Sequence, residues 1–318
     1  MILGIFVSTL IATLALGVPV AFALLICAAM MGWALDLLDP QIISQQLVLG
    51  ANNFSLLAIP FFLLAGELMN AGGMSKRIIA FAIAFVGHLR GGLGIVAIFA
   101  AIILASLSGS AAADTAALIA IMLPMMRASG HDEARSVGLL SSGGVIAPII
   151  PPSIAYIIFA VATNLSITQL FLAGIVPGVL MGLAAMAAWL IVARRDNVEP
   201  LPRQGWMTRL HETRRAIWSL GMPVIILGGI RFGIVTPTEA AVVAVVYAVF
   251  VGMVIHRELK ISHLFEVFRN AALTTAVVML LAAAALATAW FITIADLSGI
   301  VLELVGPLVE SPRLLLIV

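Results

Sequence analysis

Long apolar stretches separated by short polar connections make up most of this chain. Between Arg135 and Arg194 there is no Asp, Glu, Lys or Arg. That stretch has room for two helices of about 20 residues, the length that crosses a hydrocarbon core of about 30 Å. The apolar residues do not alternate with polar ones, which disfavours a transmembrane β-barrel. The pattern predicts an all-α polytopic membrane protein.

Ten apolar runs are the candidate membrane elements. They cover residues 2–35, 54–72, 78–88, 93–126, 137–161, 168–193, 216–230, 233–255, 271–295 and 297–309. A further run begins at Leu314 and ends with the chain at Val318. Because so short a helix leaves its backbone groups unsatisfied in lipid, we expect the chain to be a C-terminally truncated fragment of a longer protein.

The composition strengthens this prediction and removes other classes. Apolar residues make up 63% of the chain and charged residues 10%, against roughly 45–50% and 25% in soluble domains. Soluble, disordered and nucleic-acid-binding proteins are therefore excluded. The single cysteine, Cys27, excludes a disulfide framework or a cysteine metal site. The sequence has no Walker A loop, no His-Glu-x-x-His and no Gly-x-Ser-x-Gly, so no enzyme is predicted.

The basic connections predict the orientation of the chain. The segment 194–215 is rich in arginine, and the positive-inside rule places it in the cytoplasm. Counting spans back puts Arg127 and Arg135, and then Lys76 and Arg77, on the same side, with the N-terminus outside. The connection 256–260 then falls outside, against the rule.

A weak internal repeat relates the start of the chain to its second half. The segment 17–21 resembles 235–240, and 63–66 resembles 280–283 at nearly the same offset. Chance is the alternative, because these residue types are abundant. A repeat unit with an odd number of crossings gives inverted topology, the plan of many secondary transporters. We therefore expect a first repeat at 1–195, a basic cytoplasmic loop at 196–215 and an incomplete second repeat at 216–318.

The run 93–126 carries polar groups in the middle of an apolar context. They are Ser106, Ser108, Gly109, Ser110, Asp114 and Thr115. We expect a helix broken near Gly109, whose hydroxyls and unwound carbonyls offer oxygen ligands for Na⁺. The alternative is that the serines bond back to their own helix and allow close packing. Asp114 favours function, since a carboxylate inside a membrane is costly.

Two further runs contain helix-breaking residues. In 137–161, Pro148, Pro151 and Pro152 follow Gly143 and Gly144, which predicts an interrupted helix. A simple kink is the alternative. The run 54–72 contains Pro60 and Glu67, and we expect a re-entrant hairpin there. An ordinary tilted span with a snorkelling Glu67 is the alternative.

Other features indicate packing rather than chemistry. Gly174, Gly178 and Gly182 recur at every fourth position, a stripe that permits close helix contact. The histidines lie near span ends or in connections, without metal-ligand spacing, and we expect them to be solvated.

Four motifs, in order along the whole chain, resemble those of TRAP transporter large permease subunits, the DctM-like M subunits. They are Leu56–Phe62 with Ala65–Met69, Ser106–Ser110 with Ala113–Asp114, Ala147–Ile154, and Gly233–Ala240. Within that family the chain looks most similar to the 2,3-diketo-L-gulonate-type permeases.

The resemblance implies an elevator-type secondary transporter of the bacterial inner membrane. It implies import of an organic acid, a sugar acid or a dicarboxylate, driven by a Na⁺ gradient. The implied partners are a small four-helix TRAP membrane subunit and a periplasmic substrate-binding protein. No organic cofactor and no metal other than Na⁺ is implied. The segments 54–72, 93–126 and 137–161 would form the mobile transport domain, and 2–35 would belong to the scaffold.

The resemblance also assigns site residues. The implied ion-binding positions are Ser108, Gly109, Ser110, Asp114, Gly144 and Ile150. The implied substrate and gating region contains Pro60, Glu67, Pro148, Pro151, Pro152 and Ser153. A second ion site would use equivalent motifs of the second repeat, which lie beyond this chain.

Three other functions are compatible with parts of the pattern. An ion-coupled organic-anion transporter without a binding protein would share the broken helices. A non-transporting structural membrane subunit would need only packing and would leave Asp114 and the proline interruption unexplained. An intramembrane enzyme would have only Asp114 and Glu67 as an acid–base pair, and neither lies in a catalytic motif.

Overall fold

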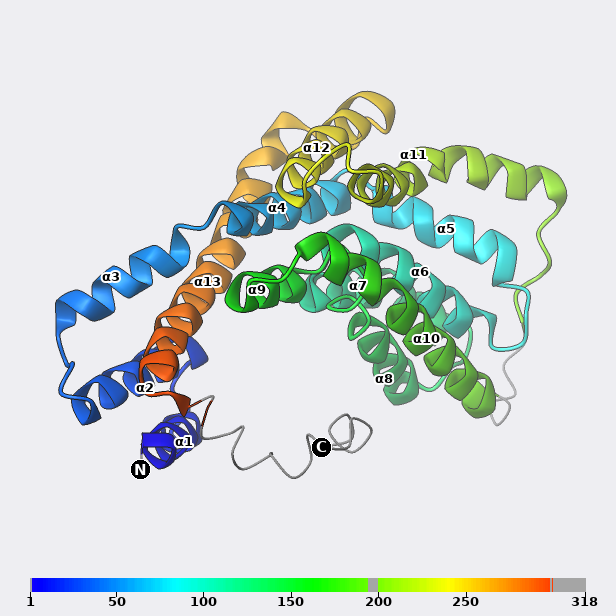
Figure 1. Ribbon diagram of the computed structural model, residues 1–318. Helices are drawn as coiled ribbons and strands as arrows, with labels where there is room; N and C mark the ends of the chain where they lie inside the picture. Colours follow the sequence, from blue (N-terminus) through cyan, green and yellow to red (C-terminus); the bar gives the residue numbers. More distant parts are fainter. Residues whose placement is uncertain (1, 194–199, 298, 300–318) are drawn as a thin grey trace. The chain divides into compact units, whose positions relative to one another are not determined.

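The computed structural model describes residues 2–193, 200–297 and 299, apart from the side chains of Leu107 and Ser108. Every regular element in that part of the chain is a helix (Figure 1). Five segments are long and apolar enough to cross a membrane: Phe54–Ala71, Ala111–Ala128, Ile167–Ala193, Pro237–Ile255 and Ile261–Ile294. These segments support the predicted polytopic α-helical class. The apolar run from Leu314 and most of the run 297–309 lie outside the described residues.

The chain divides into two compact units. One contains the described residues up to Asn53 and those from Ala276 onward, and the other is Phe54–Thr275. The boundary near the C-terminal side falls within the long helix α13 (Ile261–Ile294). These units do not follow the limits expected for the repeats at 195 and 215, because residues 276–297 pack with the N-terminal helices.

The first unit starts with two helices where one long scaffold helix, 2–35, was predicted. Its elements are α1 (Ile2–Ala15), α2 (Val20–Ala34), α3 (Pro40–Ala51) and the last part of α13. Gly17 adopts a left-handed φ of 76°, and Pro19 precedes α2. The segment 17–21 therefore ends α1 and starts α2, and α1 packs against α2.

The core of this unit joins α2 to α13. Ala28 and Met31 of α2 pack with Phe291 in a fully buried cluster. The Thr288 hydroxyl lies 3.0 Å from the Leu24 carbonyl oxygen, to which it donates. Gly32 faces the Phe291 ring so closely that an added Cβ would lie 3.1 Å from a ring carbon.

The second unit contains the remaining elements. They are η1 (Phe54–Leu57), α4 (Ala58–Ala71), α5 (Met74–Val86), α6 (Gly92–Ser108), α7 (Ala111–Ala128), α8 (Glu133–Gly144), α9 (Ile154–Thr163), α10 (Ile167–Ala193), α11 (Trp206–Arg231), α12 (Pro237–Phe250), the π-helical turn η2 (Val251–Ile255) and the start of α13. The most extensive packing is that of α4 on α12, which lie side by side in Figure 1.

The hairpin expected at 54–72 is not found there. Residues 54–71 form a 3₁₀ turn that continues into the single helix α4 without a reversal. Pro60 lies in the first turn of α4, where the missing N–H of a proline removes no intrahelical bond. The proline therefore starts this helix rather than breaking it.

A helical hairpin is formed instead by α6 and α7. A continuous helix through 92–128 would be about 55 Å long, at 1.5 Å per residue. Both ends of this segment nevertheless reach Trp189 of α10. The Trp189 indole donates to the Gly91 carbonyl at 2.9 Å, and the His131 ring stacks on it at 5.9 Å between centroids. The chain thus breaks at Gly109, as predicted, but it turns back.

The predicted interruption in 137–161 is confirmed. Helix α8 ends at Gly144, and α9 begins only at Ile154, with Pro148, Pro151 and Pro152 in the irregular segment between them. Ser153 caps α9 by accepting from the Tyr156 N–H at 3.3 Å. A simple kink does not describe this segment, because the whole of 145–153 separates the two helices.

The prediction that the connection 256–260 lies on the side opposite Lys76 and Arg77 is wrong. Arg77 at the start of α5 forms a 2.7 Å salt bridge with Glu258, which follows α12. The His256 Nδ1 lies 3.2 Å from the Gly72 carbonyl oxygen. The connection 256–260 therefore lies beside Lys76 and Arg77 and not on the opposite face.

Candidate ion and substrate site

The tip of the α6–α7 hairpin is built from a glycine and a serine. Gly109 has a left-handed φ of 60°, which a glycine adopts without strain. Ser110 then caps α7, because its hydroxyl accepts from the Ala113 N–H at 3.4 Å. These two residues end one helix and start the next, so the backbone reverses within them.

The hairpin tip lies directly on the interrupted segment. Gly109 is buried, and a Cβ added to it would overlap the Pro152 carbonyl oxygen and lie 3.4 Å from the Ser153 Cα. The two predicted interruptions, which belong to separate apolar runs of the sequence, therefore meet. Only a glycine lets the two backbones come this close.

A second close contact joins α7 to the end of α8. The Thr115 hydroxyl lies against the Cα of Gly144, where an added Cβ would overlap it and would lie 3.1 Å from the Ala111 carbonyl oxygen. Gly144 is buried. The first turn of α7 thus touches the interrupted segment on both of its sides.

The backbone of the interrupted segment is partly bonded to itself. The Gly144 carbonyl accepts from the Ala147 N–H at 3.1 Å, and the Ile146 carbonyl accepts from Ile149 and Ile150. The Ser153 hydroxyl donates to the Pro148 carbonyl. Since a carbonyl oxygen has two lone pairs, the Gly144 and Pro148 oxygens retain capacity for a cation, whereas the Ile146 oxygen already accepts two bonds.

The glycine stripe of α10 holds this segment in place, which confirms its interpretation as packing. Gly174 faces the Ile149 carbonyl, and Gly178 faces the Ile150 side chain, both closer than any Cβ would allow. Ile150 therefore points its side chain toward α10, and only its backbone is suited to the predicted ligand role.

The serines of the broken helix do not behave alike. The Ser106 hydroxyl donates to the Ile103 carbonyl at 2.6 Å, so it bonds back to its own helix as the packing alternative stated. Ser110 caps α7 at the tip. The side chain of Ser108 lies outside the described part of the chain.

Asp114 is the most buried carboxylate among the described residues. It is 2% exposed and lies in the first turn of α7, within a segment apolar enough to span a membrane. The partial positive charge at the N-terminus of a helix stabilises a carboxylate there. An ionisable group in this environment marks a functional site by default.

The structure brings Glu67 to the same tip. A cavity of about 200 Å³ is lined by Glu67 of α4, Ser110 and Thr274 of α13, together with small and apolar residues. Glu67 is half-buried. Pro60 does not line this cavity. The two residues predicted together for the gating region, Pro60 and Glu67, are therefore not both at the cavity.

Sequence reasoning did not identify several residues that contribute to the candidate site or hold the α6–α7 hairpin. Thr274 was read as part of an apolar run, although the pair Thr274–Thr275 is its polar signal. Trp189 had no signal at all, because a tryptophan near a span end is ordinary. His131 was expected to be solvated but is 9% exposed and stacked on Trp189.

The donor set around the tip consists of hydroxyl, carboxylate and carbonyl oxygens. Such oxygen donors suit a hard cation. Among the described residues there is no group of three or more His, Cys, Asp or Glu side chains close enough to hold a metal ion.

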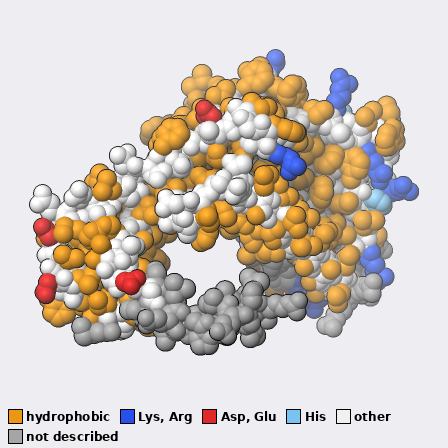
Figure 2. Space-filling model, in the orientation of Figure 1, with side chains coloured by type: hydrophobic (Ala, Val, Ile, Leu, Met, Phe, Trp, Pro, Cys, Tyr) orange, Lys and Arg blue, Asp and Glu red, His pale blue; other side chains and the backbone are white. Residues whose placement is uncertain are grey.

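The exterior defines the class of protein. Large apolar side chains such as Ile11, Val176 and Val246 are more than 60% exposed, and hydrophobic side chains cover most of the surface in Figure 2. With five membrane-length helices and two broken helices that meet, these features define a multi-pass α-helical membrane protein.

The chain belongs to the DctM family. Residues 7–318 match the family described as the tripartite ATP-independent periplasmic transporter, DctM component. The 2,3-diketo-L-gulonate TRAP transporter large permease protein YiaN of Escherichia coli (strain K12) is 54% identical over 99% of this chain and 74% of that protein. This is a transporter permease family, so the chain is a membrane permease subunit and not an enzyme.

More distant relatives carry other substrate names. The C4-dicarboxylate TRAP transporter large permease protein DctM of Pseudomonas aeruginosa is 41% identical over 84% of this chain and 63% of that protein. The sialic acid TRAP transporter large permease protein SiaM of Vibrio cholerae is 35% identical over 95% of this chain and 70% of that protein.

Proposed function

We propose that this chain forms the membrane permease of a binding-protein-dependent secondary transporter that imports an organic acid across the bacterial inner membrane, driven by a Na⁺ gradient. The observation that carries the proposal is the contact between Gly109 and Pro152–Ser153. It joins two discontinuous helices, and their irregular backbone offers oxygen atoms in a region that lipid would otherwise exclude.

The ion site is assigned to this junction. Its proposed ligands are Ser108, Gly109 and Ser110 of the tip, Asp114, and the unwound carbonyls near Gly144 and Ile150. Na⁺ would draw these oxygens together and fix the geometry of the tip. The cavity that Glu67 lines beside Ser110 supports a neighbouring position for the substrate.

The packing of the helices supports an inverted repeat. By the offset between the two similar halves of the sequence, α2 corresponds to α12, and α4 corresponds to positions 276–289 of α13. In the second unit α4 packs on α12, and in the first unit the last part of α13 packs on α2. In both units, a helix of the first repeat thus packs on a helix of the second repeat. A twofold relation between the repeats would produce these two equivalent contacts.

The α6–α7 hairpin supports the proposed orientation of the chain in the membrane and the choice of helices that would move during transport. Since both ends of α6–α7 meet at Trp189, this segment begins and ends on the same side of the membrane. The basic residues at 76–77, 90, 127, 135, 194–215 and 256–260 then all lie on the cytoplasmic side. In an elevator mechanism α6–α9 would move as a body, with α6–α7 taking the role predicted for 54–72 and with α1 and α2 in the scaffold.

The substrate class and the partners come from the relatives. Those described above are named for 2,3-diketo-L-gulonate, C4-dicarboxylates and sialic acid, all of which are carboxylic acids. We therefore assign an organic acid, with a sugar acid favoured by the 54% identity. The word tripartite in the family description supports a small membrane subunit and a periplasmic binding protein as partners.

Uptake by the complete permease in proteoliposomes tests the proposal, with its small subunit and binding protein present and succinate and 2,3-diketo-L-gulonate as probes. We expect uptake only with an inward Na⁺ gradient, and a loss of at least tenfold in Asp114→Asn. Ser142→Ala is the matched control, because its exposed hydroxyl bonds only to Gly138 of its own helix. Na⁺-independent uptake would refute the coupling, and an unchanged Asp114→Asn would refute the site.

A further inference from the structure

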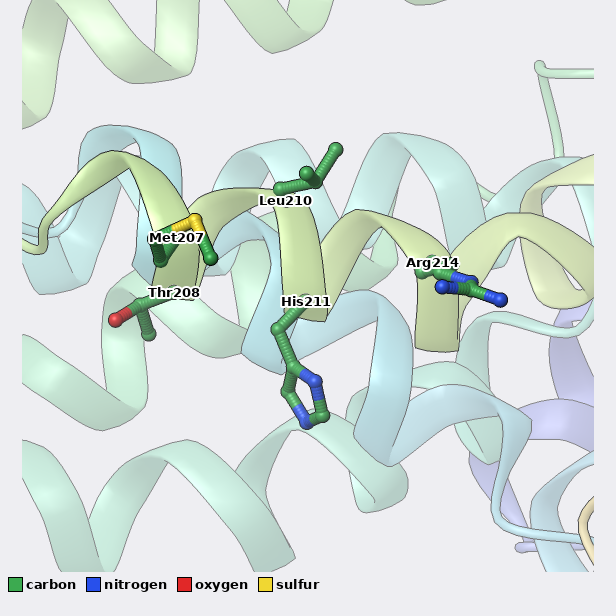
Figure 3. A pocket seen from close by; sticks show the side chains of 5 residues that line it. All are labelled: Met207, Thr208, Leu210, His211 and Arg214. Atoms are coloured by element: carbon green, nitrogen blue, oxygen red, sulfur yellow. The ribbon is translucent and has the colours of Figure 1, made fainter.

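The first turns of α11 carry an exposed face that the transport site does not use. A hollow of about 480 Å³ is lined there by Met207, Thr208, Leu210, His211 and Arg214 (Figure 3). Their spacing follows the turns of the helix and places these side chains on one side of it. Leu210 and His211 point to opposite edges of that side in Figure 3, so the face has an apolar and a polar edge.

The apolar part of this face is large for a position so close to a basic connection. Trp206 is 72% exposed, Met207 78% and Leu210 52%. An exposed apolar edge beside arginines is the pattern of a helix segment that lies in the interface of a bilayer. A tryptophan at such a point is typical of the headgroup level.

The polar part of the face carries an excess of positive charge. Residues 200–215 contain four arginines and one carboxylate, Glu212. Glu212 is largely buried and lies 3.7 Å from Arg215. Arg214 and His211 are both exposed and have no hydrogen-bond or ion-pair partner in the described part of the chain. Figure 2 shows Lys and Arg side chains gathered over the region of α11 and α5.

Two contacts fix this segment at one end of the second unit. The Arg209 side chain donates to the Ala84 carbonyl at 3.2 Å and lies 5.8 Å from the centre of the Phe85 ring, both at the end of α5. Helix α11 has 26 residues, and the charged residues of its first turns are followed by the apolar stretch 216–230. The first turns are therefore the polar end of this helix.

We propose that Thr208, His211 and Arg214 bind the phosphate headgroup of an anionic phospholipid, with Met207 and Leu210 against the start of its acyl chains. The charge excess selects an anion, and the adjacent exposed apolar side chains select an amphiphile over a free phosphate. The site anchors α11 against the membrane surface at the basic connection.

Lipid binding to the purified complete permease in detergent tests this assignment. Native mass spectrometry is used to titrate dioleoylphosphatidylglycerol, dioleoylphosphatidylcholine or inorganic phosphate. We expect phosphatidylglycerol to bind more tightly than phosphatidylcholine. We expect Arg214→Gln to weaken its binding about fivefold, the effect of one arginine near an anionic surface. Met207→Ser with Leu210→Ser should weaken it as well.

The matched control is Arg231→Gln, at the other end of the same helix and equally exposed. It should leave phosphatidylglycerol binding unchanged. Equal binding of the two lipids, or equal losses in Arg214→Gln and Arg231→Gln, would overturn the proposal. Displacement of the lipid by inorganic phosphate would show a free-anion site instead. Displacement by the small membrane subunit would show a protein interface instead, and either result overturns the lipid assignment.

Discussion

Replacing Gly109 with alanine tests the contact on which the transport site depends. Gly109 has a φ of 60°, and an L-residue in that region costs about 1–2 kcal/mol. The added Cβ would also overlap the Pro152 carbonyl oxygen. Relieving such an overlap by backbone movement costs about 1–3 kcal/mol. The expected loss in the free energy of unfolding is therefore about 2–5 kcal/mol.

Gly130→Ala separates these two contributions. Gly130 has a φ of 85°, but no heavy atom lies within 4 Å of the position of its added Cβ. This variant should lose only the backbone part, about 1–2 kcal/mol. The difference between the two variants isolates the contact between the hairpin tip and the interrupted segment.

Thermal unfolding of the detergent-solubilised chain, followed by size-exclusion chromatography with fluorescence detection, measures the difference. At about 2–4 °C per kcal/mol, the midpoint of Gly109→Ala should lie about 2–12 °C below that of Gly130→Ala. Equal midpoints would show that Gly109 does not touch Pro152 and would remove the observation that supports the ion site.

Three further changes test other contacts. Arg77→Gln and Glu258→Gln, combined in a double-mutant cycle of thermal unfolding, should show a coupling of about 0.5–1 kcal/mol that weakens at high salt. Burial, and next the charge of Arg77, lower the pKa of His256. The folded chain therefore binds fewer protons than the unfolded chain below about pH 6.5, so stability falls as the pH drops, and His256→Gln should reduce this fall. Trp189→Phe removes the bond to the Gly91 carbonyl and should cost about 1–2 kcal/mol in thermal unfolding.

Each of these changes has a matched control. The pair Glu212–Arg215, at 3.7 Å within one helix, should show a smaller coupling than Arg77–Glu258. For His256→Gln the control is the same comparison well above pH 6.5, where this imidazole is neutral in the folded and unfolded chain and its titration contributes nothing. Trp218→Phe, at a residue that is 46% exposed, should change stability little. Effects in the controls as large as those in the test variants would contradict the assigned contacts.

Local features of the fold could be predicted where one segment determines them. The run 168–193 matches α10 almost end to end, because a helix of uniformly apolar residues needs no other signal. The start of α12 is also determined locally. Thr236 accepts from the Glu239 N–H at 3.3 Å, and the Glu239 carboxylate accepts from the Thr236 N–H at 2.7 Å, which forms a capping box.

The direction that the chain takes after a helix break could not be predicted, because it depends on contacts with residues far away in the sequence. The break at Gly109 was read correctly, but a break does not say whether the next helix continues or returns. That choice is made by Trp189, which lies much further along the chain in α10. Pro60 was read as a breaker because its place in the first turn of α4 depends on where that helix begins. For the candidate site, the residue types were foreseen, whereas the cavity shared by Glu67 and Thr274 was not.

The tethering of the hairpin has a consequence for the lengths of its helices. Helices α6 and α7 have 17 and 18 residues, so they are about 26 and 27 Å long. Their far ends are held at one indole, and their tip is held at Pro152. A residue inserted in one helix alone would shift the tip by about 1.5 Å and rotate it by about 100°. The length of the hairpin is therefore fixed. It tolerates an insertion only when α6 and α7 are both lengthened by whole turns.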